Sequence, residues 1–375
     1  MKPQISILFD AYHLYHLAQF EPLMTLLEKD DRFDVYYSTS SENRKDEIEL
    51  CSSILLKRKG QFVFHIDENI RCEKIKDIGL DVFICGWSRY DIHNYVNDNT
   101  LVAMIYHGIG VKPSYWNDNH SRLDLRFVEG EYRINQLREN GVSTDLSLTG
   151  YIKLDPLFNN EASSSFEDKK KMLGLNKSRP TILYAPTFYP SSLEKLGMQL
   201  GHLTKEYNLI IKPHMWTYYL DSFGGVNLKG QRKLIYNLSE KFDHVKLLSP
   251  DEHNIIPYYS ISDLLLTEAS STIYEMIALS KPVVVNRFYH LKLSHRIFQK
   301  RLYKRRLNKE MNDEVKNFCF LADNIKQLPF VLDEAIKHKH KDIVSMREYQ
   351  KKMLYKLDGQ ASNRARDEIL RRLKN

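Results

Sequence analysis

The sequence predicts an α/β protein made of two successive, doubly wound parallel units, and three observations support this. Its 375 residues suit two or three domains at about 150 residues each. Short apolar runs alternate with longer amphipathic stretches, as expected for buried parallel strands connected by helices. The alternation stops at a polar, charged segment, residues 159–176, and then starts again, which indicates a domain boundary.

The first unit, residues 1–160, is predicted to be a Rossmann-like domain. Amphipathic periodicity predicts helices at His16–Lys29 and Gly130–Asn140. Seven runs rich in apolar residues are expected to be strands: Ile5–Phe9, Val35–Ser38, Phe62–Ile66, Asp81–Cys85, Leu101–Tyr106, Leu125–Val128 and Leu146–Thr149.

The second unit, residues 161–340, repeats the pattern and is predicted to be a second Rossmann-like domain. Residues 341–375 form a separate C-terminal helical segment, interrupted near Gly359, a residue type suited to a helix C-terminus. The strands expected in the second unit are Thr181–Ala185, Leu209–Lys212, Val245–Leu248, Leu264–Thr267 and Val283–Val285.

Two Rossmann-like domains facing a central cleft make up the GT-B architecture of many nucleotide-sugar enzymes, and we expect that architecture here. Ligands of open α/β sheets bind beyond the carboxyl ends of the strands, so functional residues should directly follow them. Four loops meet this criterion: His107–Gly110, Pro186–Phe188, Pro213–Met215 and Glu268–Thr272.

The composition narrows the cellular location and the binding partners that we expect for this protein. Lys and Arg exceed Asp and Glu by seven, which is compatible with anionic partners such as nucleotides or acidic lipid. Four cysteines without metal-ligand spacing favour a reduced cytoplasm and predict no metal site. The N-terminus lacks a secretory pattern, and no apolar run reaches the roughly 18 residues that cross a bilayer. No nucleic-acid-binding module is visible.

The hydroxyl-rich turn Ser270-Ser271-Thr272 has two interpretations. Thr272 and Glu275 fit a capping box, which would make this only a well-capped helix start. Alternatively, amide groups and hydroxyls at the helix start hold phosphate, while Glu275 binds the ribose of a nucleotide.

Two histidines follow strands and are candidates for chemistry. His107 precedes Gly108, which lets a ligand approach the backbone, and its imidazole suits a general base that deprotonates an alcohol. His214 follows Lys212-Pro213 and could donate a hydrogen bond to phosphate. Each could instead be structural.

Residues 287–309 contain no Asp or Glu, and their Lys and Arg residues interleave with Phe298, Leu302 and Tyr303. A solvated helix, docking on an anionic membrane surface, and contact of Arg287 with donor phosphates all remain open. The location expected is therefore cytoplasmic, with peripheral attachment to the inner face of the membrane as an option.

Six segments in their order along the chain resemble the CDP-glycerol glycerophosphotransferase family of teichoic-acid primases and polymerases. Glu268 stands where members of that family commonly carry Asp. The segments are YHG at Tyr106–Gly108, TGYIKLDPL at Thr149–Leu157, YAPTF at Tyr184–Phe188, IKPH at Ile211–His214, Leu265–Val284, and DGQAS at Asp358–Ser362.

The resemblance implies a GT-B enzyme that transfers glycerol phosphate, or a related alditol phosphate, from a CDP-activated donor to an acceptor hydroxyl and releases CMP. The acceptor would be lipid-linked or an oligosaccharide, bound on the side of the N-terminal domain, in synthesis of a teichoic-acid or capsule polymer. His107 would be the base. Phosphate would be held by His214, Ser270, Ser271 and Thr272, and the nucleotide ribose by Glu275. Apart from the resemblance, the position of Pro186 and Thr187 directly after a strand makes them candidates for nucleotide contact, and the basic stretch makes Arg287 a candidate for phosphate contact.

Other functions remain open. A sugar transferase of the same architecture, for capsule or lipopolysaccharide, is the alternative enzyme, and a non-catalytic nucleotide-binding scaffold is the alternative from another class. No dedicated ligand cluster for Mg²⁺ is visible, although such an ion could help to neutralise the pyrophosphate.

Overall fold

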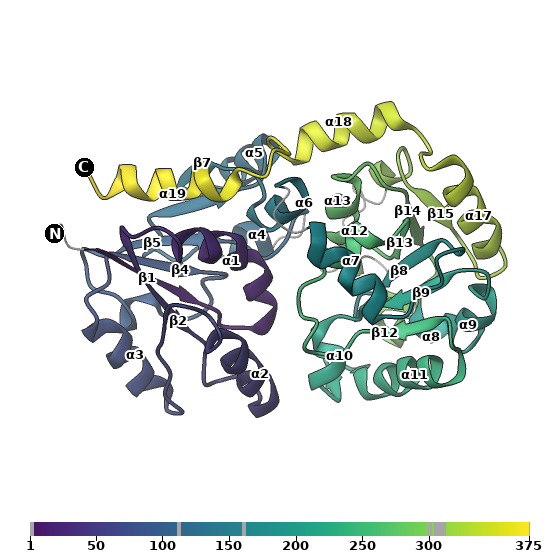
Figure 1. Cartoon of the computed structure of the whole chain (residues 1–375), viewed down its shortest axis with the longest axis horizontal. Coiled ribbons are helices and arrows are strands. Elements are labelled where there is room, and N and C mark those ends of the chain that lie inside the picture. The colour runs from purple at the N-terminus through teal and green to yellow at the C-terminus, as the bar shows by residue number, and fades with distance from the viewer. Residues whose placement is uncertain are drawn as a thin grey trace. The chain divides into compact units, whose positions relative to one another are not determined.

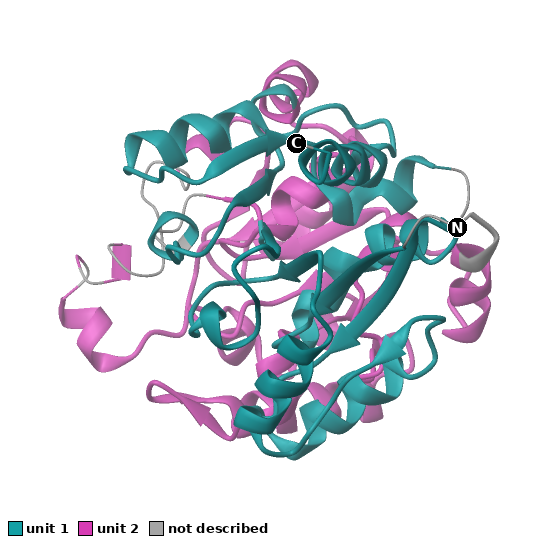
Figure 2. Cartoon of the chain, turned by 90° about the vertical axis from the view of Figure 1, so that its left-hand side faces the viewer, with its two compact units in different colours: residues 1–108, 113–159, 351–375 teal, residues 109–112, 160–350 magenta. Residues whose placement is uncertain are grey.

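The computed structural model describes residues 4–110, 114–159, 163–298, 300, 302–303 and 313–374. The chain divides into two units, each with its own parallel sheet (Figure 1). Unit 1 holds residues 1–108, 113–159 and 351–375, and unit 2 holds residues 109–112 and 160–350 (Figure 2).

The sheet of unit 1 has seven strands in the order β3-β2-β1-β4-β5-β6-β7, all paired in parallel. This order, which runs outward on both sides from β1 and β4, is that of a doubly wound fold and confirms the prediction. The strands are β1 (Ile5–Asp10), β2 (Phe33–Ser38), β3 (Gln61–Phe62), β4 (Val82–Cys85), β5 (Leu101–Ile105), β6 (Leu125–Val128) and β7 (Asp145–Leu148).

Helices connect and cover these strands. Residues of β1, β4 and β5 pack with Ile75 of α3 in one buried apolar cluster, because central parallel strands are covered on both faces. The helices of unit 1 are α1 (Leu14–Leu27), α2 (Lys45–Leu55), α3 (Glu68–Asp77), η1 (Ile92–Asn94), α4 (Ser114–Asn117), α5 (Glu131–Glu139), η2 (Ile152–Leu154), α6 (Asp155–Phe158) and α19 (Ala361–Arg372).

The last helix returns to the first unit. α18 (Ile343–Met353) carries the chain from unit 2 to unit 1, where α19 packs against α1. Asp155 accepts hydrogen bonds from the amides of Ala361 (3.0 Å) and Ser362 (2.7 Å), the first residues of α19. Gly359 lies in the loop before α19, not at the end of α18, and has φ +68°. Two of the family-like segments, TGYIKLDPL and DGQAS, are therefore joined by hydrogen bonds.

The main sheet of unit 2 has six parallel strands in the order β12-β9-β8-β13-β14-β15. Two elements were missed from the sequence: its edge strand β15 and a short antiparallel hairpin, β10–β11. The strands are β8 (Thr181–Ala185), β9 (Asn208–Ile211), β10 (Ser222–Phe223), β11 (Val226–Asn227), β12 (Val245–Leu247), β13 (Leu264–Thr267), β14 (Val283–Asn286) and β15 (Phe320–Ala322).

Nine described helices belong to unit 2 in addition to the start of α18: α7 (Ser163–Met172), α8 (Leu193–Leu196), α9 (Gln199–Leu203), α10 (Met215–Tyr219), α11 (Leu228–Lys241), α12 (Ile256–Ile261), α13 (Thr272–Ile277), α14 (Leu293–Ile297) and α17 (Leu328–His338). In the part of the chain that the structure describes, no helix has both the length and the apolar character needed to cross a membrane.

Candidate active site

His107 follows β5 at the carboxyl edge of the unit 1 sheet and lies within a cluster of aromatic rings. Its ring centroid is 4.9 Å from that of Tyr15, 5.2 Å from that of His16 and 4.5 Å from that of Tyr106. Its Nδ1 lies 3.5 Å from the carbonyl oxygen of Gly86. A carbonyl can only accept, so this contact assigns the proton to Nδ1 and leaves Nε2 of the neutral ring as a proton acceptor.

His16 belongs to this cluster, although the sequence analysis did not single it out. It is fully buried in α1. Burial, reinforced by the neighbouring His107 and His13, holds the pKa of His16 well below its ordinary value, so the ring is neutral. Gly86 packs against that ring so closely that a Cβ there would lie 2.6 Å from its Cγ. A glycine directly after a strand was the available signal.

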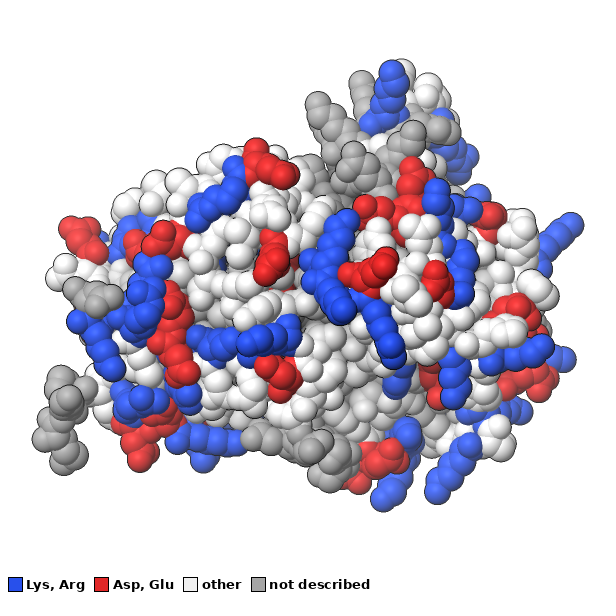
Figure 3. All heavy atoms as spheres, turned by 90° about the horizontal axis from the view of Figure 1, so that it is seen from above, with Lys and Arg blue, Asp and Glu red and all other residues white. Residues whose placement is uncertain are grey.

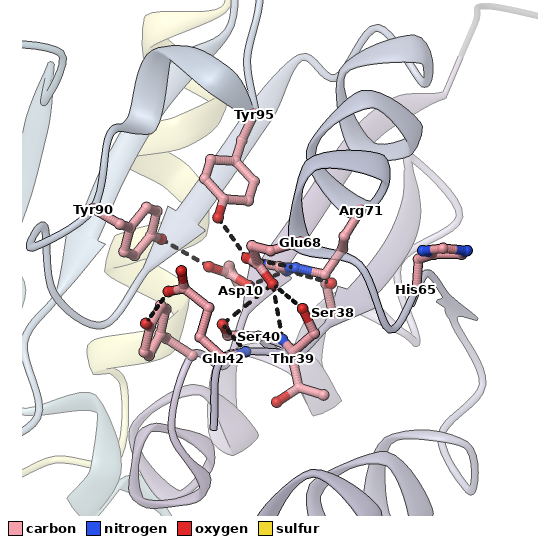
Figure 4. A network of polar contacts seen from close by, with 12 residues as sticks. Asp10, Ser38, Thr39, Ser40, Glu42, His65, Glu68, Arg71, Tyr90 and Tyr95 are labelled. Atoms are coloured by element: carbon pink, nitrogen blue, oxygen red, sulfur yellow. Dashed lines mark hydrogen bonds and ion pairs between the residues drawn. The ribbon is translucent and has the colours of Figure 1, made fainter. Parts of the chain in front are cut away.

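A buried polar network occupies the same edge of the sheet beside β1 and β2 (Figure 4). Arg71 donates to Asp10 (2.8 Å) and to the hydroxyl of Ser38 (2.7 Å), and it pairs with Glu68. Burial raises the pKa of Asp10 despite the nearby guanidinium. Burial also opposes ionisation of Glu68, but Arg71 and other donors lower the pKa of Glu68 to about 2. The network holds the loop that follows β2 in place.

In unit 2, Glu268 joins the end of β13 to the loop after β8. The carboxylate is fully buried and accepts from the amide of Thr187 (2.7 Å) and from the amide (3.1 Å) and hydroxyl (2.5 Å) of Ser192. Tyr184 also donates to it, at 3.2 Å. Burial raises the pKa of Glu268 to about 7. Thr187 and the buried Pro186, both predicted to bind nucleotide, therefore lie in a loop that Glu268 holds in place.

The predicted capping box is wrong. The N-cap of α13 is Ser271 and makes no side-chain capping bond, while Thr272 is already the first helical residue. Instead, the Thr272 hydroxyl lies 3.3 Å from that of Thr267, and the Thr272 amide donates to the hydroxyl of Ser270 (3.3 Å). Glu275 is buried and accepts from the hydroxyl of Tyr259 (2.9 Å).

His214 is the N-cap of α10 and has a defined tautomer. Its Nδ1 accepts a hydrogen bond from the amide of Trp216 (3.2 Å), so the proton of the neutral ring is on Nε2. Its ring centroid is 4.9 Å from that of Phe188 in the loop after β8. The structure thus brings together the loops after β8 and β9, and Glu268 links the first of them to β13.

Arg287 follows β14 and forms an ion pair with Asp323, which follows β15. Its Nε donates to the carboxylate at 2.7 Å, and its backbone amide donates to the carbonyl of Ala322 (2.9 Å). A phosphate contact of Arg287, as predicted, would have to share the guanidinium with Asp323.

Asp91, His93 and His120 each place one potential metal-ligand atom within 4.8 Å of the others. No local spacing in the sequence indicates this cluster, because Asp91 and His93 lie at η1 whereas His120 comes much later in the chain, before β6. Nδ1 of His120 accepts from the amide of Arg122 (3.1 Å), which puts its proton on Nε2, 3.6 Å from the Asp91 carboxylate. At 3.6 Å this contact is too long for a hydrogen bond, and we assign no ion to the cluster.

Known proteins share this fold. The wall teichoic acid polymerase TagF superimposes with a TM-score of 0.67 at 15% identity, covering 100% of this chain and 90% of that one. The UDP-GlcNAc 2-epimerase from Neisseria meningitidis gives 0.59 at 14% identity, with full coverage of both chains. At such identities the likeness concerns the fold alone, and it confirms the predicted GT-B-like class.

Sequence comparison is more specific. The teichoic acid poly(glycerol phosphate) polymerase of Bacillus spizizenii is 31% identical over an aligned length of 147 residues, and the alignment covers 36% of this chain. The match spans about a third (33%) of the length of that curated relative. Residues 112–371, well over half of the chain, match one family throughout. The resemblance is therefore confirmed, and the chain belongs to the CDP-glycerol:poly(glycerophosphate) glycerophosphotransferase family.

Proposed function

We propose that this protein transfers glycerol phosphate, or a related alditol phosphate, from a CDP-activated donor to the terminal hydroxyl of a lipid-linked or oligosaccharide acceptor. The product is a cell-surface polymer of the teichoic-acid type. Family membership supports the reaction class. The observation that carries the assignment of roles is the opposite tautomers of two histidines: Nε2 of His107 accepts a proton, whereas Nε2 of His214 donates one.

The proposed reaction balances without a covalent enzyme intermediate. Nε2 of His107 takes the proton of the acceptor hydroxyl as the oxygen attacks the phosphorus that bears glycerol. A new phosphodiester bond forms, the bond from that phosphorus to the CMP oxygen breaks, and CMP leaves. Catalysis then consists mainly of positioning and of charge stabilisation.

The donor is proposed to bind at the carboxyl edge of the unit 2 sheet. His214 donates to its phosphates, and Ser270, Ser271 and Thr272 add hydroxyl groups. The loop that carries Pro186 and Thr187 and the buried Glu275 are proposed to contact or support the nucleotide. Arg287, which is paired with Asp323, would add a further donor to the phosphates.

Calorimetric titration of the full chain with CDP-glycerol, CDP-ribitol, UDP-GlcNAc and CMP tests this proposal. We expect the CDP-alditols and CMP to bind and UDP-GlcNAc to bind at least tenfold more weakly. A preference for UDP-GlcNAc would support a sugar transferase instead, and binding of no nucleotide would support a scaffold.

We also propose peripheral docking on an anionic membrane surface through residues 292–303. Leu293, Ile297, Phe298 and Tyr303 are exposed there, at 70%, 63%, 52% and 43%, beside basic side chains. Residues 299, 301 and 304–309 of the basic stretch lie outside the described residues. On the face seen in Figure 3, acidic and basic side chains are intermixed.

Co-sedimentation with vesicles tests the docking. At low salt, binding to phosphatidylglycerol vesicles but not to phosphatidylcholine vesicles is expected, with release as the ionic strength rises, because screening weakens the attraction. The double variant Leu293→Ser/Ile297→Ser should bind more weakly. Equal binding to both vesicle types, or none at low salt, would contradict docking.

A further inference from the structure

Unit 1 contains a cavity of about 530 Å³ that none of the proposed roles uses. It is lined by Ser88, Arg89, Asn117, Asp118, Asn119 and His120, from the loop after β4 and the segment between α4 and β6. Its volume is in the range of small-molecule sites. Every lining side chain can form hydrogen bonds, which is unusual for a site that holds an apolar ligand and typical of one that holds a polyol or a phosphate.

Arg89 is the basic group of this cavity, and its neighbours orient it. Its Nε donates to Asp118 at 3.2 Å, and its guanidinium carbon lies 4.8 Å from the ring centroid of Trp87. Asp118 is buried and also accepts from the amide (2.7 Å) and hydroxyl (2.8 Å) of Ser88. Among the described residues, no recorded hydrogen bond uses the Nη atoms of Arg89, whose side chain is 49% exposed. The guanidinium is thus held at its Nε edge, while its two Nη groups can bind an anion.

Asn119 adds a second oriented group. Its Oδ1 accepts from Arg126 (3.0 Å) and from the hydroxyl of Thr144 (3.1 Å), which fixes the amide plane. With Oδ1 engaged in this way, the amide nitrogen of Asn119 supplies donors for a ligand oxygen.

The cavity adjoins the ring cluster around His107. Trp87, which stacks on Arg89, has its ring centroid 5.5 Å from that of His16, and His16 is 5.2 Å from His107. Arg89 also interacts electrostatically with Tyr15 and Tyr106, both of which contact the His107 ring. A chain bound in the cavity could therefore present its end to the proposed base.

We propose that this cavity binds the acceptor, and specifically an alditol phosphate unit close to its reactive end. Arg89 binds the phosphodiester through its Nη atoms, a geometry that suits two phosphate oxygens at once. Asn119 and its neighbours bind the polyol hydroxyls. This inference rests on the proposed function and adds to it the place in unit 1, and the side chains Arg89 and Asn119, that would hold a phosphate-containing acceptor.

The test measures initial rates of transfer from CDP-glycerol to two soluble acceptors, an oligo(glycerol phosphate) and a neutral oligosaccharide. Arg89→Gln should raise KM for the oligo(glycerol phosphate) by about 10- to 100-fold, the effect of losing a hydrogen bond to a charged group. It should leave kcat within about threefold and leave the affinity for CDP-glycerol unchanged. For Arg89→Lys, which keeps the charge but not the two-pronged geometry, KM for the oligo(glycerol phosphate) should lie between the values for the wild type and Arg89→Gln. KM for the neutral acceptor should not respond to Arg89→Gln.

Arg371→Gln is the matched control, because Arg371 is likewise an exposed arginine of unit 1 in an ion pair, 2.7 Å from Glu368. An unchanged acceptor KM in Arg89→Gln, or an equal rise in Arg371→Gln, overturns the inference while leaving the proposed function intact.

If the wild-type protein transfers no glycerol phosphate, the proposed function fails. Direct titration with oligo(glycerol phosphate) then tests whether the cavity binds such a chain. Binding that is lost in Arg89→Gln supports the subsite, and no binding by the wild type overturns it.

Discussion

At the scale of single residues, hydrogen bonds to the backbone define what the two candidate histidines can do. The Gly86 carbonyl assigns the proton of His107 to Nδ1, and the Trp216 amide assigns that of His214 to Nε2. Sequence alone indicates that a histidine follows a strand, but it does not indicate which ring nitrogen carries the proton. That property depends on which backbone group the fold places beside the ring.

We predict that His107→Ala lowers kcat for transfer by about 100- to 10,000-fold, the usual contribution of a general base. The dissociation constant for CDP-glycerol should stay within about twofold, because the donor contacts are assigned to unit 2. Steady-state rates and calorimetric titration measure the two effects separately. His65→Ala, which replaces a half-buried histidine on the loop between β3 and α3, serves as the control and should retain activity. Wild-type turnover in His107→Ala would remove the base assignment.

Some residues could not be identified from the sequence. Glu268 was noticed only as a substitution for an expected Asp, yet it is the buried acceptor that holds the loop after β8. Arg89 and Asn119 were not noticed at all, because the cavity they line forms between segments about 30 residues apart. Residue type and spacing report on local chemistry, whereas these roles come from tertiary contacts.

At the scale of the elements, the strands were predicted best where they are central and fully buried. β8 and β13 begin and end as expected, because a strand covered on both faces is largely apolar. Pro180 and Pro186 bound β8, and Asp263 and Glu268 bound β13. β3 is shorter than predicted, and β15 was missed. Both are edge strands, which pair on one side only and so place weaker demands on sequence.

Glu268, which connects β13 to the loop after β8, leads to a prediction about how stability depends on pH. Glu268 has a folded-state pKa of about 7 against an ordinary value of 4.5, so the folded state keeps a proton that the unfolded state releases. Its contribution to the free energy of unfolding is present below pH 4.5, declines as pH rises to about 7, and is constant above that. The decline amounts to about 3 kcal/mol at most.

Glu268→Gln isolates this effect, because glutamine does not titrate. Urea unfolding at several pH values between 4 and 8 should show that the difference in stability, wild type minus variant, falls as pH rises. Glu194→Gln is a useful comparison, since burial also raises the pKa of that carboxyl, which lies on α8. A wild-type minus Glu268→Gln difference that is constant with pH would contradict the assignment.

At the scale of the whole molecule, the order of elements was predictable and the path of the C-terminus was not. Two successive α/β patterns indicated two doubly wound sheets, and the strand orders of both units agree with this. Residues 341–375 were expected to form a segment of their own, whereas the structure groups residues 341–350 with unit 2 and residues 351–375 with unit 1. The hydrogen bonds from Ala361 and Ser362 to Asp155 join positions about 200 residues apart, which no local pattern reveals.

The most direct test of the proposed function is acceptor-dependent release of CMP from CDP-glycerol by the full chain, followed by chromatography together with mass spectrometry of the acceptor. The proposal predicts one CMP released for each glycerol phosphate unit added to an oligo(glycerol phosphate) acceptor, and none added without the enzyme. Release of CMP with no growth of the acceptor, or growth of the acceptor only when a UDP-sugar replaces CDP-glycerol, would contradict it.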